Sequence, residues 1–165
     1  MVRISPTYSE ILVSSLPAEE VMKKALRVTR EMNYLDPISF ESHEKHLFNG
    51  TVHNDTFHLS LKTENADSFI PLIRGKVETT RKGCILFLHY SFFPSTVFFL
   101  GFWIVATFFM MLFFLTLQLD LKLAALCLVA GMGNYWFSSM HFMRKVKQSQ
   151  KALHHMLDLQ PNDPR

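Results

Sequence analysis

Cysteine, glycine and recognisable catalytic motifs are scarce in this 165-residue chain. Its two cysteines, Cys84 and Cys127, are too few for a disulfide framework or a Cys-rich zinc site. Its six glycines form no phosphate-binding loop, and the sequence contains neither Gly-x-Ser-x-Gly nor His-Glu-x-x-His. We therefore expect a protein that is not an enzyme and that binds no cofactor and no metal ion.

Charge is almost absent from residues 92–143, which hold only Asp120 and Lys122. Residues 1–91 hold 11 basic and 11 acidic side chains, so the net charge of +3 arises after residue 143. Because the N-terminal half has no basic excess, nucleic acid is not an expected partner. With 48% hydrophobic and 19% charged residues, the chain is also too apolar to be disordered.

Two long hydrophobic runs indicate membrane-spanning helices. Val97–Leu117 has 21 residues and no charge, and as a helix it is roughly 31 Å long, about the thickness of the hydrocarbon core of a bilayer. A second run covers Leu121–Met143, after a connection too short to hold a domain. We expect a transmembrane hairpin over residues 91–143, with helices at about 95–117 and 121–143.

Basic residues on both sides of this hairpin predict its orientation. Arg81 and Lys82 precede it, and residues 144–165 form a basic tail that either extends the second helix or lies at the membrane surface. Because basic flanks stay on the cytoplasmic side, both termini are expected there. The expected contacts with lipid headgroups are Arg144, Lys145, Lys147 and Lys151.

The second apolar run carries a stripe of small or polar side chains at steps of three and four residues. Such residues let transmembrane helices approach closely and form hydrogen bonds across the contact. The stripe is either a packing seam against the first helix or a homo-oligomer seam with a polar path through Asn134. Its members are Ala124, Cys127, Gly131, Asn134, Ser138 and His141.

Residues 46–90 show strand patterns. A turn at Asn54-Asp55 joins two alternating segments, in a register that places Val52 opposite Phe57 and Gly50 opposite Leu59. A second strand pair follows, with its turn at residues 81–83. Ahead of these strands, Pro17–Met32 is typical of a helix, whereas residues 11–13 could form a strand.

These patterns predict an α+β membrane protein. Residues 1–90 are expected to form a cytoplasmic domain with an N-terminal helix and a small antiparallel sheet or partly open barrel, ahead of the two-helix transmembrane hairpin.

Eight histidines suggest a possible metal site. His43, His46, His53 and His58 occur in one region, and the last two share the polar face of the expected strand pair. No cysteine lies near that face, and solvent-exposed histidines explain the same pattern. We therefore do not expect a metal site there.

Several motifs resemble those of a group of small, uncharacterised bacterial membrane proteins. The motifs are Phe48-x-Gly50-x-Val52, Phe57-x-Leu59, Ser68-Phe69-x-Pro71-x-Ile73-x-Gly75-Lys76-Val77 and Gly83-x-Ile85, followed by the apolar hairpin. In that group Asn commonly stands at the position of Asp67, and Ile at the position of Val77. The resemblance implies a bacterial inner-membrane location and brings no catalytic residues with it.

The expected function is that of a non-enzymatic, two-pass inner-membrane protein. Its β-rich domain would bind a protein partner, while the hairpin anchors it in the lipid bilayer and supports self-association. One alternative is a ligand-gated, membrane-perturbing effector of a bacterial defence system, and another is an immunity protein against a membrane-acting toxin.

Overall fold

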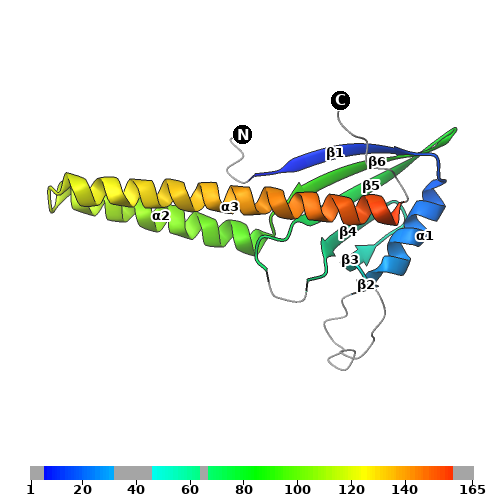
Figure 1. Cartoon of the computed structure of the whole chain (residues 1–165), viewed down its shortest axis with the longest axis horizontal. Helices are drawn as coiled ribbons and strands as arrows, with labels where there is room; N and C mark the ends of the chain where they lie inside the picture. Colours follow the sequence, from blue (N-terminus) through cyan, green and yellow to red (C-terminus); the bar gives the residue numbers. More distant parts are fainter. Residues whose placement is uncertain (1–5, 32–45, 64–66, 158–165) are drawn as a thin grey trace, which may run out of the picture.

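The chain forms a sheet from which a long helical hairpin projects (Figure 1). The computed structural model describes residues 6–31, 46–63 and 67–157. The sheet order is β1-β6-β5-β4-β3-β2, with five antiparallel strands and β2 added in parallel beside β3. The elements are β1 (Tyr8–Ser14), α1 (Ala18–Val28), β2 (Thr29–Glu31), β3 (Phe48–Val52), β4 (Thr56–Leu61), β5 (Leu72–Thr80), β6 (Gly83–Ser91), α2 (Pro94–Thr116) and α3 (Leu121–Met156).

The α+β class is confirmed, but one detail of the predicted domain is wrong. A strand, β1, precedes α1, so the domain does not begin with a helix. Residues 11–13 lie in this strand because their alternating side chains fit the edge of the sheet beside β6. Of the two predicted forms, a sheet or a partly open barrel, the structure has the sheet, with β1 and β2 as its two edges.

Helix α1 is shorter than the predicted Pro17–Met32. It ends at Val28, and Thr29 already has an extended backbone. The Thr29 hydroxyl donates a hydrogen bond of 2.6 Å to the carbonyl of Ala25, which satisfies one of the free acceptors at the helix end. Residues 29–31 then pair with β3, so sheet pairing replaces the last turn of the expected helix.

The two predicted strand pairs are confirmed. Val52 pairs with Phe57 and Gly50 with Leu59, in the expected register. Strands β5 and β6 pair along their whole length, from Leu72 opposite Ser91 to Thr80 opposite Gly83. The alternation of buried and exposed residues along β5 means that only one face of this strand meets the core.

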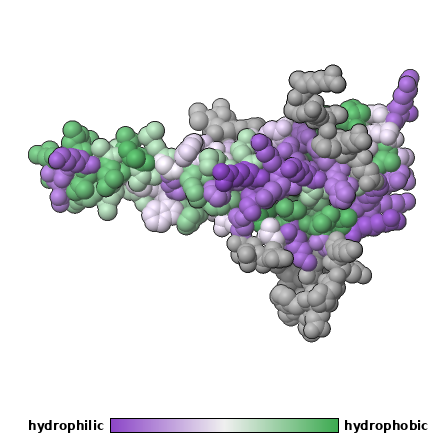
Figure 2. Space-filling model, in the orientation of Figure 1, coloured by the Kyte–Doolittle hydropathy of each residue, from purple (hydrophilic) through white to green (hydrophobic). Residues whose placement is uncertain are grey.

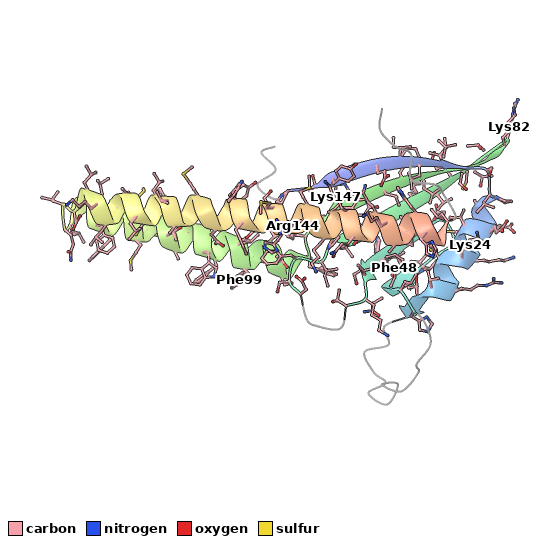
Figure 3. The ribbon with its side chains drawn as sticks, in the orientation of Figure 1. Lys24, Phe48, Lys82, Phe99, Arg144 and Lys147 are labelled. Carbon is pink, nitrogen blue, oxygen red and sulfur yellow. The ribbon has the colours of Figure 1, made fainter. Side chains whose placement is uncertain are left out.

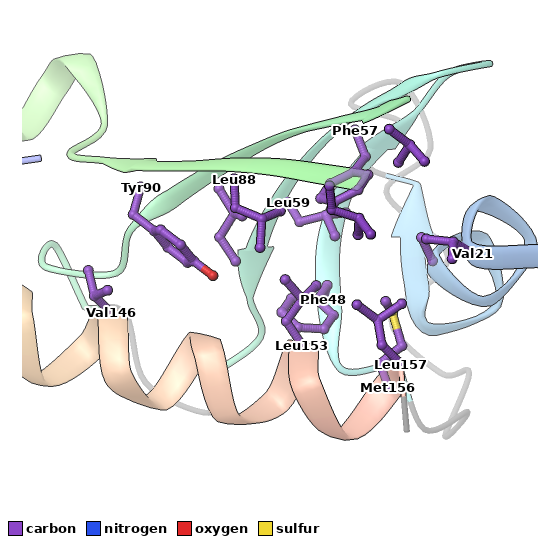
Figure 4. Packing of buried hydrophobic residues seen from close by; sticks show 14 of the residues in the cluster. Val21, Phe48, Phe57, Leu59, Leu88, Tyr90, Val146, Leu153, Met156 and Leu157 are labelled. Carbon is purple, nitrogen blue, oxygen red and sulfur yellow. The ribbon is translucent and has the colours of Figure 1, made fainter. Parts of the chain in front are cut away.

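Helix α1 and the second half of α3 cover the same face of the sheet (Figure 4). Val146 and Leu153 of α3, and Leu157 directly after it, are buried in one cluster with residues such as Phe48 and Tyr90 of the strands. Burying each large apolar side chain contributes about 1.5–3 kcal/mol. The core of the domain therefore includes residues that follow the hydrophobic hairpin in the sequence.

Gly75 gives the first test of this packing. A Cβ atom at Gly75 would overlap the ring of Phe57, which is fully buried on the neighbouring strand. We expect Gly75→Ala to lower the free energy of unfolding by about 1–3 kcal/mol, because the ring has no free space to enter. Thermal unfolding of the purified protein measures this change. The matched control is Gly133→Ala, where nothing lies within 4 Å of the added atom and stability should not fall.

Candidate functional site

The helical hairpin exposes most of its apolar surface. In the most apolar 18-residue windows of α2 and α3, only 6% and 11% of the residues are buried. Figure 2 shows this hydrophobic surface along the projecting part of the molecule, and Phe99 points outward from it in Figure 3. Both helices are long and apolar enough to cross a membrane, which is consistent with a membrane location.

The first four residues of the predicted stripe lie in the first half of α3 and differ in exposure. Ala124 is buried, whereas Cys127, Gly131 and Asn134 are partly exposed. Gly131 faces α2, because a Cβ atom there would lie 3.0 Å from the Oγ1 atom of Thr107. This glycine lets the two helices approach closely at mid-length.

The other two stripe residues lie farther along α3. Ser138 is buried, and its hydroxyl has no hydrogen-bond partner within the described ranges. His141 stacks beside Phe69 and Phe137, with ring centroids 5.7 and 4.2 Å away. His141 therefore belongs to the contact between the hairpin and the sheet domain.

Helix α3 continues without a break through the expected boundary at residues 143 and 144. Past this point it has a buried face with the helical spacing of four, three, four and three residues. The buried residues of this face are Phe142, Val146, Ser149, Leu153 and Met156. One continuous helix thus carries half of the hairpin and also packs on the sheet, while residues 158–165 of the expected tail lie outside the described residues.

The four expected headgroup contacts fall into two groups. Arg144, Lys147 and Lys151 are exposed, and the first two are labelled in Figure 3. Lys145 differs, because its Nζ atom lies 2.7 Å from Oδ2 of Asp67. Lys145 is therefore engaged within the chain.

The segment just before β5 connects the sheet to both long helices. Besides its ion pair with Lys145, Asp67 accepts a 2.9 Å hydrogen bond from the backbone N–H of Phe69. The ring of Phe69 packs near Phe92 and Phe137, and Thr96 of α2 donates a 2.8 Å hydrogen bond to the carbonyl of Ser68. These contacts hold the bases of α2 and α3 to one segment.

Opposing effects act on the pKa of Asp67. Burial acts to raise this pKa, but the hydrogen bonds from Lys145 and Phe69 and the charges of Lys145 and His141 hold it below its usual value. Because the pKa of the folded state is depressed, the ion pair stabilises fully above the unfolded pKa of about 3.9. That stabilisation is lost as the pH falls through the lower, folded-state pKa.

We expect Asp67→Asn to destabilise the protein by about 1 kcal/mol at pH 7, since it removes a partly exposed ion pair. Thermal unfolding in detergent at pH 7 and below pH 3 measures the change. The difference from the wild type should shrink in acid, where Asp67 itself becomes protonated. Asp55→Asn, in the exposed turn after β3, serves as the control. A loss for Asp67→Asn that is equal at both pH values would contradict the ion-pair explanation.

A second polar cluster fixes the far part of α3 to the sheet. Glu10 of β1 accepts a 2.8 Å hydrogen bond from Gln150 and lies 3.1 Å from Nε2 of His154. The hydroxyl of Tyr90, a fully buried residue, donates a longer bond of 3.5 Å to the same carboxylate. Burial, reinforced by the negative charge of Glu10, raises the pKa of Tyr90 above its usual range, so this hydroxyl stays protonated.

We expect Glu10→Ala to cost about 1–3 kcal/mol, because it leaves the buried Tyr90 hydroxyl without an acceptor. Amide hydrogen exchange should become faster in residues 150–156, at the end of α3, and stay unchanged in α2. Glu19→Ala on the exposed side of α1 is the matched control. If residues 150–156 keep their protection, the cluster does not hold α3 on the sheet.

The histidine and cysteine candidates that the structure describes do not form a common site. His53 and His58 are exposed, and within residues 6–31, 46–63 and 67–157 no three His, Cys, Asp or Glu side chains lie close enough to hold a metal ion. His43 lies outside the described residues. Cys84 is buried in the core, and burial raises the pKa of its thiol, which disfavours the reactive thiolate.

In comparisons with known proteins, no protein family, no curated protein and no solved structure matches the chain.

No pattern in the sequence predicts the contacts of Asp67 and Glu10. Glu10 and His154 are 144 residues apart, and no local pattern links them. A signal does exist for the packing of α3 on the sheet. Apolar residues continue at helical spacing beyond Arg144, among basic side chains, as in an amphipathic helix.

Proposed function

We propose that this protein is a non-enzymatic protein of the bacterial inner membrane, anchored by a hairpin that crosses the bilayer twice. Its sheet domain would lie in the cytoplasm, directly at the membrane surface, and would bind a protein partner. The observation that carries the proposal is the exposed apolar surface of α2 and the first part of α3. In water this surface would be strongly unfavourable, whereas a bilayer accepts it.

The dimensions of the hairpin favour a complete crossing. Helix α2 has 23 residues, so it is roughly 34 Å long, slightly more than the hydrocarbon core of a bilayer. At the tip, the Asp120 carboxylate accepts hydrogen bonds from the N–H groups of Lys122 and Leu123. Two charged side chains at the tip favour a position in the headgroups of the opposite leaflet, because charges in the membrane interior are costly.

The basic residues of α3 support a cytoplasmic sheet domain. Arg144, Lys147 and Lys151 are exposed immediately beyond the apolar part of α3. Anionic lipids of the cytoplasmic leaflet attract such side chains, each by about 1 kcal/mol. The same flank predicts that both termini are inside, under the rule that basic segments are retained in the cytoplasm.

The attachment of the sheet domain to α3 supports a position directly at the membrane surface. Asp67 and Glu10 connect the sheet to α3 at two separate points, so the domain would be held at the membrane without a flexible linker. Self-association through the exposed part of the hairpin remains part of the proposal, with Cys127 and Asn134 partly accessible.

Topology mapping tests the proposal. A cysteine at Gln118→Cys, at the tip, should react with a membrane-impermeant thiol reagent added to intact spheroplasts, in a Cys84→Ser and Cys127→Ser background. A cysteine at Lys82→Cys, in the β5–β6 turn, should react only after lysis. The protein should also resist extraction by alkaline carbonate. Extraction into the soluble fraction, or labelling of Lys82→Cys in intact spheroplasts, would overturn the proposal.

A further inference from the structure

A row of polar side chains crosses the outer face of the sheet, the face opposite α1 and α3. Ser9, His89, Arg74 and His58 are direct neighbours on β1, β6, β5 and β4. Strands lie about 4.8 Å apart, so this row is roughly 15 Å long. The Oγ atom of Ser9 is 2.9 Å from Nδ1 of His89, which orients the imidazole ring.

Arg74 gives this row an uncompensated positive charge. Its side chain is exposed, and it forms no ion pair with any acidic residue in the described part of the chain. Glu78, farther along the same face of β5, is bound to Lys76 at 2.8 Å. An arginine flanked by imidazole and hydroxyl groups has the chemistry that binds phosphate oxygens.

An apolar groove lies on the hairpin beside the start of β1. It has a volume of about 500 Å³, and its lining includes Pro6, Val97, Gly101 and Tyr135. Gly101 leaves it open, because a Cβ atom added there would meet nothing within 4 Å. In a membrane such a groove faces the acyl chains of lipids.

The groove and the polar row are close along the chain. Pro6, which lines the groove, is three residues before Ser9, a distance of at most about 10 Å in an extended strand. A phospholipid combines the two kinds of group that these features would bind, a phosphate and the acyl chains next to it.

We propose that one anionic phospholipid binds here, with an acyl chain in the groove and its phosphate on Arg74, beside the Ser9–His89 pair. This inference rests on the proposed function, since the groove must lie in the bilayer. A second copy of the hairpin could fill the groove but would leave the charge of Arg74 unneutralised. A free phosphate would satisfy Arg74 but leave the groove empty. The lipid accounts for both features.

Native mass spectrometry of the full-length protein in detergent tests the site, with phosphatidylglycerol and phosphatidylcholine as probes. The protein should retain phosphatidylglycerol in preference to phosphatidylcholine. Arg74→Gln should lower the retention of phosphatidylglycerol about fivefold, the typical effect of one basic side chain at an anionic surface. Gly101→Leu should also lower its retention, because the added side chain would occupy the groove. Two matched controls should retain the lipid. They are Arg81→Gln, in the exposed turn, and Gly133→Leu, at a glycine that is equally open but lies outside the groove.

Four results would overturn this inference. They are equal retention of both lipids, full retention by Arg74→Gln, displacement of phosphatidylglycerol by inorganic phosphate alone, and a dimer that Gly101→Leu abolishes. Displacement by phosphate would indicate a free-phosphate site, and such a dimer would indicate a second copy in the groove. Carbonate extraction, measured on the same cells, reports on membrane insertion separately, so failure of the proposed function can be distinguished from failure of the lipid site.

Discussion

The exposed apolar surface of the hairpin is the constraint on which the rest of the structure depends. At about 25 cal/mol per Å², even a few hundred Å² of apolar surface in water opposes solubility by several kcal/mol. Helices can satisfy their backbone hydrogen bonds internally, so a helical hairpin can place this surface in lipid. The basic flank of α3 and the charged tip are both compatible with that placement.

Helix α3 belongs both to the apolar hairpin, whose surface is exposed, and to the sheet domain, in which one face of the helix is buried. Its first half has almost no buried face, whereas its second half supplies a regular buried face to the core of the domain. Asp67 and Phe69 lie where these halves meet, and Glu10 contacts α3 near its end. Because a continuous helix is stiff, a shift of the sheet against α3 would be transmitted to the base of the hairpin.

Local patterns in the sequence predicted the strand register and the two long helices. The register of β3 and β4 follows from alternating side chains on either side of a two-residue turn, and the two long helices follow from uninterrupted apolar runs. The end of α1 was not readable, because Thr29–Glu31 has a helical pattern that sheet pairing with β3 overrides. The polar cluster around Glu10 depends on contacts between residues that are 80 and 140 positions apart.

The sequence by itself determined the class of most segments, since helix or strand periodicity and hydrophobic length are properties of neighbouring residues. Only the tertiary structure decided that the basic segment after Met143 is part of the domain core, that Lys145 pairs with Asp67, and that Arg74 is aligned with His89 and Ser9. These outcomes depend on how the strands are ordered and on which face α3 covers. The strand order and the face that α3 covers depend on the burial of many side chains that are distant in the sequence. No local sequence pattern contains that information.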